Sequence, residues 1–191
     1  MKNPRFWNKI YEMENVIDSD LTVLEIMTYG CPVLKQKAEP VTDITPELVH
    51  LAKNMARTMH AAPGIGLAAP QVNHSLRLIT IDLSVGEKDD QLIVLINPEI
   101  IEEEGEILME EGCLSVPEIN EKVARPQRVV LKAVTMEGKD LIIEAEGLLA
   151  RVFCHEVDHL NGKLFIEHLS PLKQRLIKKK FKKQRQAEEI P

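Results

Sequence analysis

The sequence lacks the features that mark secreted, disulfide-framed and membrane-spanning proteins. Three cysteines at scattered spacing, an odd number, do not form a disulfide framework and are typical of a reducing cytosol. The apolar stretches are far shorter than the roughly 20 residues that a transmembrane helix needs. Residues 1–22 contain no apolar signal run, and they carry acids, which organellar transit peptides avoid. We therefore expect a soluble intracellular protein without a membrane partner.

An excess of positive charge is also missing. The chain has 24 basic and 30 acidic residues, and its net charge of −6 argues against general nucleic-acid binding. The charge is unevenly distributed, because residues 173–185 contain eight Lys or Arg and no acid, which leaves −14 for the rest. Ser170 and Pro171 are N-cap and first-turn signals for a C-terminal helix there. Its expected apolar stripe is Leu172, Leu176, Ile177 and Phe181. Such a helix is either solvated or docks on an acidic or RNA surface.

The hydrophobic pattern predicts helices on both sides of a block of strands. Thr45 and Pro46 are start signals for a helix over 46–61. Residues 76–145 contain four β-branched runs, LRLITIDL, LIVLINPEI, RVVLKAV and LIIEA. The sequence GLLARVFCHEVDHL predicts a helix over 147–160. This order predicts an α+β fold, with antiparallel or mixed β-sheets around a central helix, one helix on the N-terminal side and one at the C-terminus.

The clearest chemical signal is an HExxH sequence that begins at His155 in the central helix. His155 and His159 are four residues apart, which places both imidazoles on one helix face, where they can bind one metal ion. Glu156 lies about 100° around the helix, where a general base for water can act. Asn161 and Gly162 are typical of a helix end. The pattern favours a metal hydrolase.

A catalytic metal takes three protein ligands and leaves one position for water. The chain after the motif offers chiefly Glu167, whereas Cys113 in the upstream sequence EGCLS is a better donor. A thiolate with two imidazoles suits Zn²⁺ or Fe²⁺ and suits Mg²⁺ or Ca²⁺ poorly. For Cys113 alone, a buried thiol without function is the alternative. Surface or core roles are expected for His50, His60, His74 and His168.

Residues 64–71, GIGLAAPQ, join the first predicted helix to the first predicted strand. Gly64 and Gly66 allow another backbone to approach closely, as when a peptide binds alongside as an extra strand. Gln71 offers an amide donor. The segment is not a phosphate-binding loop, because it lacks the Lys-Ser/Thr pair that contacts nucleotide phosphates.

The sequences GIGLAAPQ, EGCLS and HEVDHLNG occur in the order and at the separations that resemble peptide deformylase. The resemblance extends from about Leu24 to Lys180 and includes VLEIMTYGCPVLKQKAEPV near the start. It implies a metal-dependent hydrolase that removes the N-formyl group from the N-terminal methionine of newly synthesised polypeptides and releases formate. It also implies Fe²⁺ as the ion, although the same ligands accept Zn²⁺, Ni²⁺ or Co²⁺.

The resemblance also implies a role for each candidate residue. The implied metal ligands are Cys113, His155 and His159. The groups implied to act on the formyl amide are Glu156, which moves protons, and Gln71 and the backbone N–H of Leu114, which stabilise the oxyanion. Gly66 is implied to pair with the substrate backbone.

The methionine side chain is flexible and apolar, so its pocket should be apolar and lie beside the metal. We expect Leu148, Val152 and Ile65 to form its wall, and Arg151 to shape its rim through its stem.

The implied partners are N-formylmethionyl nascent peptides and, through the basic C-terminal helix, the ribosome; no DNA or membrane partner is expected. Formylated starts indicate a bacterial cytoplasmic protein. We divide the chain into an N-terminal extension of unknown role (1–22), a metal-dependent deformylase domain (23–170), and the basic C-terminal helix and tail (171–191).

One residue departs from the usual pattern of the family. Cys154 stands where the family commonly has glutamine, and because adjacent helix residues point about 100° apart, it cannot easily share an ion with His155. We expect Cys154 to pack near the site without binding the metal.

Two alternative functions remain open from the sequence. The first is a zinc endopeptidase, which would cut internal peptide bonds. The second is a metal-stabilised interaction module that binds ribosomal RNA through its basic tail.

Overall fold

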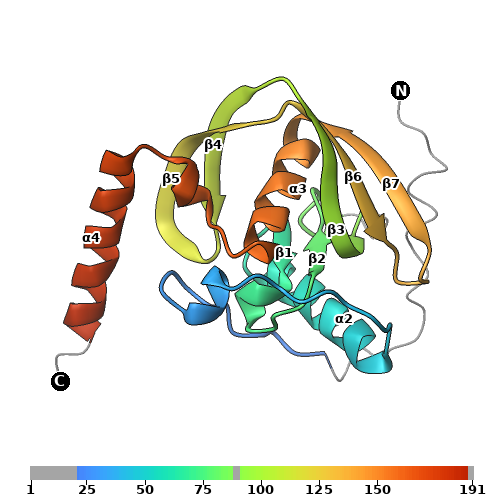
Figure 1. Ribbon diagram of the computed structural model, residues 1–191. Helices are drawn as coiled ribbons and strands as arrows, with labels where there is room; N and C mark the ends of the chain where they lie inside the picture. Colours follow the sequence, from blue (N-terminus) through green and yellow to red (C-terminus); the bar gives the residue numbers. More distant parts are fainter. Residues whose placement is uncertain (1–20, 88–90, 189–191) are drawn as a thin grey trace.

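The computed structural model describes residues 21–87 and 91–188 (Figure 1). The N-terminal extension expected at residues 1–22 therefore lies outside the described residues, apart from Leu21 and Thr22. Within the described part, the elements follow the expected order of helix, strands, helix and helix. None of the described helices is both long enough and apolar enough to cross a membrane.

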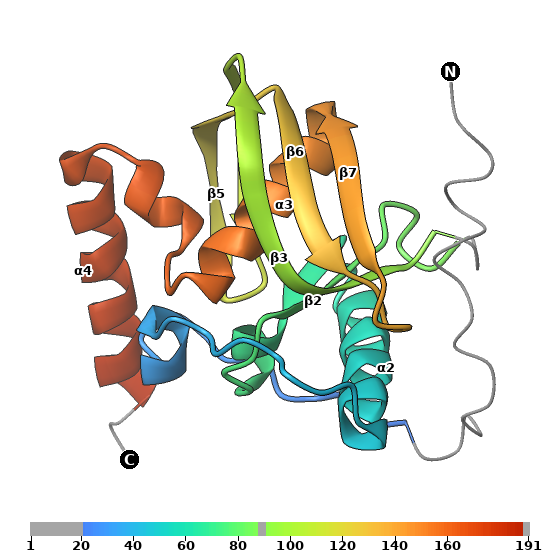
Figure 2. The ribbon, with the colours of Figure 1, turned by 45° about the vertical axis from the view of Figure 1, so that its right-hand side comes forward.

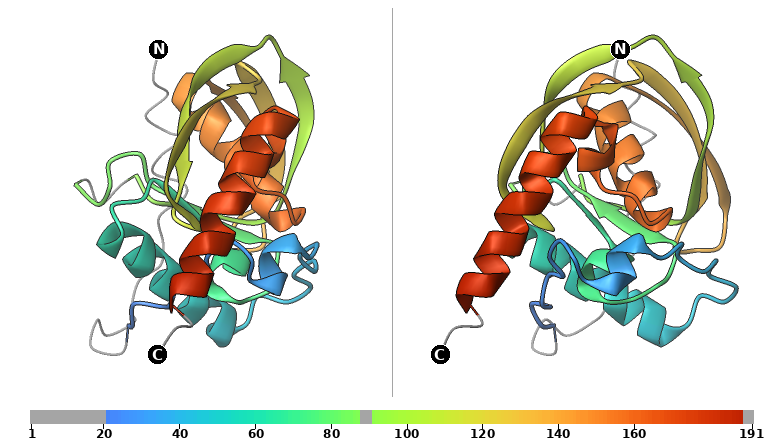
Figure 3. Two further views of the ribbon diagram at one scale, coloured as in Figure 1. Left: turned by 90° about the vertical axis from the view of Figure 1, so that its left-hand side faces the viewer. Right: turned by 60° about the vertical axis from the view of Figure 1, so that its left-hand side comes forward.

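The described strands form two antiparallel sheets. The larger sheet has the strand order β1 (Gly66–Ala68), β2 (Leu78–Ile81), β3 (Ile93–Glu104), β6 (Arg128–Val134) and β7 (Asp140–Glu146). The smaller sheet pairs β4 (Ile107–Cys113) with β5 (Val116–Arg125). Helix α3 (Gly147–Leu160), which contains the HExxH sequence, lies between the two sheets (Figures 1 and 3). The arrangement confirms the predicted α+β fold.

Alternate residues of the larger sheet face α3. Leu131 of β6 and Ile143 of β7 are fully buried in a core cluster with Ala150 and Phe153 of the helix. Burial of one such large apolar side chain contributes about 1.5–3 kcal/mol to the free energy of folding. Lys132, next to Leu131 in β6, is exposed, as expected for a strand with one buried face. This packing fixes α3 against the sheet.

Helix α2 (Pro46–Ala61) has the bounds that the sequence predicted. The Thr45 hydroxyl accepts a hydrogen bond from the Leu48 backbone N–H at 3.3 Å, which caps the first turn. Met55 is fully buried in a second core cluster, which includes Leu67 of β1. Because of this packing, α2 supports the strand that carries the GIGLAAPQ sequence.

The C-terminal end of α3 is held by the loop that precedes α2. The Leu160 carbonyl accepts hydrogen bonds from the Ala38 backbone N–H at 2.9 Å and from Arg77 Nη1 at 3.4 Å. Gly162 follows with φ +71°, and a Cβ at this position would lie 2.7 Å from the Lys35 carbonyl group. The glycine is therefore required both by its left-handed conformation and by the backbone against it.

Helix α4 (Pro171–Glu188) lies at the edge of the molecule (Figures 2 and 3). Ile177 and Phe181 are buried, and the Phe181 ring lies 4.9 Å from that of Tyr29. Leu172 and Leu176 are exposed, so the single stripe predicted from four apolar residues is wrong. Ile177 and Phe181, four residues apart, pack against the body of the molecule, whereas Leu172 and Leu176 face away from it.

We predict that alanine at Gly162, just after α3, destabilises the protein more than alanine at Gly147, the first residue of α3. Gly147→Ala should lower the free energy of unfolding by about 1–2 kcal/mol, because φ at Gly147 is +62° but no atom would contact the new Cβ within 4 Å. Gly162→Ala should cost clearly more, about 3 kcal/mol or above, because strain and a backbone collision add. Urea unfolding of both variants measures the difference, and equal losses would contradict this account of the cap.

Candidate metal centre

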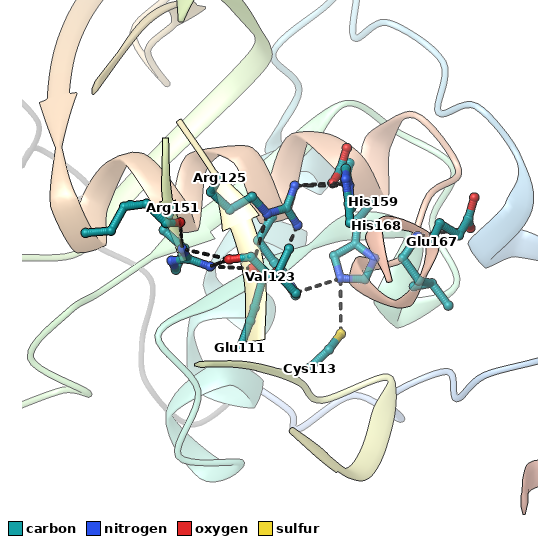
Figure 4. Close-up of polar contacts among 12 residues, drawn as sticks. Glu111, Cys113, Val123, Arg125, Arg151, His159, Glu167 and His168 are labelled. Atoms are coloured by element: carbon teal, nitrogen blue, oxygen red, sulfur yellow. Dashed lines mark hydrogen bonds and ion pairs between the residues drawn. The ribbon is translucent and has the colours of Figure 1, made fainter. Parts of the chain in front are cut away.

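Three side chains from two elements converge on one point. His155 and His159 come from α3, and Cys113 is the last residue of β4. Figure 4 shows Cys113 and His159 pointing toward each other. Cys113 Sγ lies 3.2 Å from His159 Nε2, which lies 3.2 Å from His155 Nε2, and all three ligand atoms are within 4.8 Å of one another.

These separations fit a metal ion. A tetrahedral ion with two nitrogens at 2.0–2.1 Å and a sulfur at 2.3 Å holds its ligand atoms about 3.3–3.6 Å apart. His155 Nδ1 lies 2.5 Å from a Glu111 carboxylate oxygen, which places the ring proton on Nδ1 and leaves the Nε2 lone pair directed at the centre. The donor set of the three residues therefore suits a soft divalent ion.

The charge of the neighbouring side chains favours a thiolate at Cys113. Burial raises the pKa of this thiol, but its interactions with His159 and His155 outweigh burial and lower the pKa to about 5. A thiolate is the form that binds metals, so Cys113 is ready to act as a ligand near neutral pH.

The Glu111 carboxylate orients His155 and is itself held by two arginines, Arg125 and Arg151. Its Oε1 lies 2.8 Å from Arg125 Nη2, and its Oε2 lies 3.1 Å from Arg125 Nε and 2.9 Å from Arg151 Nη1. Burial acts to raise the pKa of this carboxyl, but the hydrogen bonds from His155 and Arg125 hold it well below its usual range. Glu111 therefore stays ionised.

Glu111 has no predicted role, although it lies in the EGCLS sequence, and Arg151 was expected only to shape a pocket rim. Arg151 is 3% exposed, and its guanidinium lies inside the charge cluster, so its contacts extend beyond the pocket. A signal was present in the spacing, since Arg151 is one helical turn before His155 and so shares its buried face.

Glu156 lies beside the three candidate ligands and is 3% exposed. Its Oε2 is buried without a hydrogen-bond partner among the described residues. Burial raises the pKa of this carboxyl to about 7, and the neighbouring histidines only partly oppose the effect. A Cβ at Gly66 would overlap Glu156 Oε1 and would lie 3.1 Å from Val152 Cγ1. Gly66 therefore leaves the space that the Glu156 carboxylate occupies.

Gln71 is 1% exposed, and its amide has one orientation. Its Oε1 accepts a hydrogen bond from the Ala68 backbone N–H at 2.8 Å, so its Nε2 faces the centre. There Nε2 donates to Ser115 Oγ at 3.2 Å and lies 3.7 Å from Cys113 Sγ. The amide nitrogen is thus placed next to a candidate metal ligand.

The candidate residues line one cavity of about 550 Å³. The predicted residues that line it are Ile65, Gly66, Gln71, Cys113, Leu114, Leu148, Arg151, Val152, His155 and Glu156. Leu148, which was expected in the pocket wall, is 45% exposed and so lies at the opening of the cavity. The sequence motifs are therefore brought together, and His159 joins them through its contacts with Cys113 and His155.

Cys154 and Glu167 lie apart from this group. Cys154 lines a different cavity of about 1070 Å³, together with Arg125 and Asp158, and burial raises the pKa of its thiol to about 12. Glu167 Oε1 instead accepts a hydrogen bond from the Leu164 backbone N–H at 3.2 Å. Neither side chain belongs to the cluster of possible ligands found among the described residues.

We predict that the two cysteines of this region affect metal binding differently. Cys113→Ala should weaken the affinity for Co²⁺ by more than about 100-fold. Loss of a residue that only hydrogen-bonds to a metal ligand typically lowers the affinity about 10–100-fold, and loss of a ligand itself should cost more. Cys154→Ala should keep wild-type affinity, because its thiol faces the other cavity. Competition with a chromophoric chelator measures both, and a strong loss in Cys154→Ala would contradict the assignment.

Comparison with known proteins finds peptide deformylases that match most of the chain. The family model of polypeptide deformylase matches residues 23–175. The peptide deformylase of Thermodesulfovibrio yellowstonii is 52% identical over 162 residues, which cover 85% of this chain and 98% of the relative. That of Syntrophobacter fumaroxidans is 48% identical over 163 residues, which cover 85% and 96%.

Solved structures agree with these relatives. A peptide deformylase from Legionella pneumophila superposes with a TM-score of 0.81 at 41% identity and covers 89% of this chain and 99% of its own. One from Ehrlichia chaffeensis has a TM-score of 0.79 at 34% identity and covers 88% and 100%. Because the family model spans most of the chain and relatives share about half of its residues, the chain belongs to the peptide deformylase family.

Proposed function

We propose that the cavity beside Cys113, His155 and His159 is the active site for the reaction of this family. The reaction removes the N-formyl group from the N-terminal methionine of newly synthesised polypeptides and releases formate. The observation that carries the proposal is the convergence of a thiol and two imidazole nitrogens next to the buried carboxylate of Glu156. This is the donor set and base of a metal hydrolase.

The protein groups divide the work of hydrolysis. When bound, a divalent ion supplies Lewis acidity and makes water a stronger acid. Glu156 accepts the proton of the attacking water and delivers it to the amine as the C–N bond breaks. Its pKa of about 7 suits both directions of transfer. Gln71 Nε2 and the backbone N–H of Leu114 donate to the formyl oxygen as it gains negative charge, which contributes about 2.7–4 kcal/mol for each donor.

The cavity suits the side chain of the substrate methionine. Ile65 and Val152 provide apolar surface inside it, and Leu148 covers the opening. A flexible thioether can adapt to such a wall. The backbone of Gly66 lies at the same cavity and pairs with the substrate backbone as an added strand.

The ion that we propose is Fe²⁺. One thiolate and two imidazoles accept Fe²⁺, and they also accept Zn²⁺, Ni²⁺ and Co²⁺, so availability in the cell decides among them. An iron–thiolate centre reached through an open cavity should be sensitive to oxygen, and protein prepared without air should carry the native ion.

We predict that anaerobically purified protein contains about one iron per chain and releases formate from a formyl-Met peptide. Glu156→Gln should lower kcat by about 10²–10⁴ with the metal content unchanged, because it removes the base but not a ligand. A coupled formate dehydrogenase assay measures turnover, and elemental analysis measures the metal.

The same assay separates the alternatives. Cleavage of an internal bond in an unblocked peptide, without formate, would show an endopeptidase instead. Wild-type turnover in Glu156→Gln would contradict the role of the base and would favour a metal-stabilised interaction module. Release of formate that requires Glu156 excludes both.

We also propose that the basic residues of α4 bring the enzyme to the ribosome, near its emerging substrate. Lys178, Lys179 and Lys182 are exposed on a helix anchored through Ile177 and Phe181. Lys173 and Lys180 instead contact Glu121 and Glu118 of β5 at 2.5 and 3.2 Å, so they attach the helix to the domain. Lys178, Lys179 and Lys182 form no ion pair with the described residues and are thus available for phosphates.

We predict that replacing Lys178, Lys179 and Lys182 with glutamine weakens ribosome binding at least tenfold at low salt. The slope of log affinity against log salt should fall by about 2–3, because each lost phosphate contact contributes about 0.7–0.9. Glutamine at Lys122, Lys132 and Lys139, exposed on strands or at the hairpin end, is the matched control. Equal affinity and slope for both triple variants would refute the proposal, with formate release as the check on folding.

A further inference from the structure

Arg151 is a buried cation next to the candidate metal centre. It is 3% exposed and lies one helical turn before His155 on α3. A charged guanidinium removed from water is strongly destabilising unless most of its donors are paired, so its partners show what it holds in place.

The partners of Arg151 all belong to the smaller sheet. Its Nη1 donates to Glu111 Oε2 at 2.9 Å and to the Val123 carbonyl at 3.2 Å. Its Nη2 donates to the Ile107 carbonyl at 2.9 Å and to the same Val123 carbonyl at 3.2 Å. The side chain therefore joins the helix that carries the two histidines to both strands of the sheet that carries Cys113.

The hydrogen bond from Arg151 fills the last acceptor position of the Glu111 carboxylate. Oε2 receives Arg151 and Arg125 Nε, while Oε1 receives Arg125 Nη2 and His155 Nδ1. A carboxylate has about four acceptor positions, and here each oxygen has two donors. Glu111 thus has one orientation, and it is not available as a ligand or a base. Without Arg151, Oε2 would keep one donor at 3.1 Å.

The orientation of Glu111 determines two of the three candidate ligands. Its bond to His155 Nδ1 fixes the ring and its tautomer. Glu111 and Cys113 are two residues apart in β4, and their side chains contact His155 and His159 of the same helix. Holding Glu111 against α3 therefore also sets the position of the thiol relative to the histidines.

Arg125 donates two hydrogen bonds to Glu111, and Arg151 donates one, but the other contacts of Arg125 are with Asp158 and His168. Its Nη1 lies 2.5 Å from Asp158 Oδ2 and 3.2 Å from His168 Nε2, on the side of α3 where Cys154 lies. Arg151 is the arginine that binds the β4 and β5 backbone as well as the carboxylate, as the dashed lines of Figure 4 show in part.

We propose that Arg151 is a positioning residue of the metal centre: anchored on the backbone of the smaller sheet, it holds Glu111 against α3, and through Glu111 it places Cys113 and His155 for one ion. The proposal rests on the assignment of these two residues as ligands. It requires that Arg151 affects metal affinity through Glu111 and not through stability alone.

The test compares Arg151→Met, which keeps the length of the stem without its donors, with Arg128→Met as the matched control. Arg128 forms two ion pairs with exposed glutamates of the larger sheet, so it tests the loss of an arginine away from the centre. Arg151→Met should bind Co²⁺ 10–100-fold more weakly and shift the visible absorption of the bound ion, whereas Arg128→Met should change neither.

A double-mutant cycle with Glu111→Gln tests the route of the effect. If Arg151 acts through Glu111, the double variant should lose no more Co²⁺ affinity than Glu111→Gln alone. Additive losses would overturn the proposal, and so would wild-type affinity and absorption in folded Arg151→Met.

Should Arg151→Met fail to fold, Arg151→Lys serves in its place. A lysine can reach the carboxylate but cannot bind it and two carbonyls as a planar fork, so we expect a several-fold loss of affinity and a shifted spectrum. A folded lysine variant with wild-type affinity and spectrum would overturn the proposal. Unchanged affinity in Cys113→Ala would instead refute the metal centre itself, and tight Co²⁺ binding without formate release would refute only the activity.

Discussion

The Glu111 carboxylate is the buried anion on which the arrangement of the metal centre depends. It is 7% exposed, and it receives hydrogen bonds from His155, Arg125 and Arg151. Removing one partner of such a buried ion pair typically costs about 3–5 kcal/mol, because the remaining charge is left without compensation. The carboxylate thus joins α3 to the smaller sheet, and it does so at the histidine that faces the proposed ion.

The space around the centre depends on a second close contact, between β1 and α3. Gly66 lies against the Glu156 carboxylate, where a Cβ would displace it. Because β1 is the edge strand of the larger sheet, the same glycine backbone also lies at the cavity that we assign to substrate. The absence of a side chain at Gly66 therefore leaves room for the Glu156 carboxylate and, in the proposed function, for the substrate backbone.

The sequence predicted those elements whose limits are set by local chemistry. The helices over 46–61 and 147–160 have these bounds, because Thr45 caps the first and Gly162 follows the end of the second. Strands β4 and β5 were not predicted, because neither lies in one of the four β-branched runs, and Cys113 is the last residue of β4. Its strand alternates between half-buried and exposed residues, and adjacent glutamates at 110 and 111 hide that alternation.

That the three motifs share one site was also predicted from the sequence, because each motif has recognisable chemistry within a few residues. The charge cluster around Glu111 was missed, because its partners come from α3 and β5, and such pairing follows from tertiary packing. Tertiary packing also explains why Leu176 is exposed and Ile177 is buried. Only the contact with Tyr29 and its neighbours decides which of the two side chains is buried.

The central claim is that Cys113, His155 and His159 bind one metal ion in a geometry already present in the fold. X-ray absorption of the zinc-loaded protein tests it most directly. We predict one sulfur at about 2.3 Å and two imidazole nitrogens at about 2.0–2.1 Å, with the remaining coordination by light atoms. A spectrum without a sulfur neighbour, or with fewer than two imidazoles, would contradict the account.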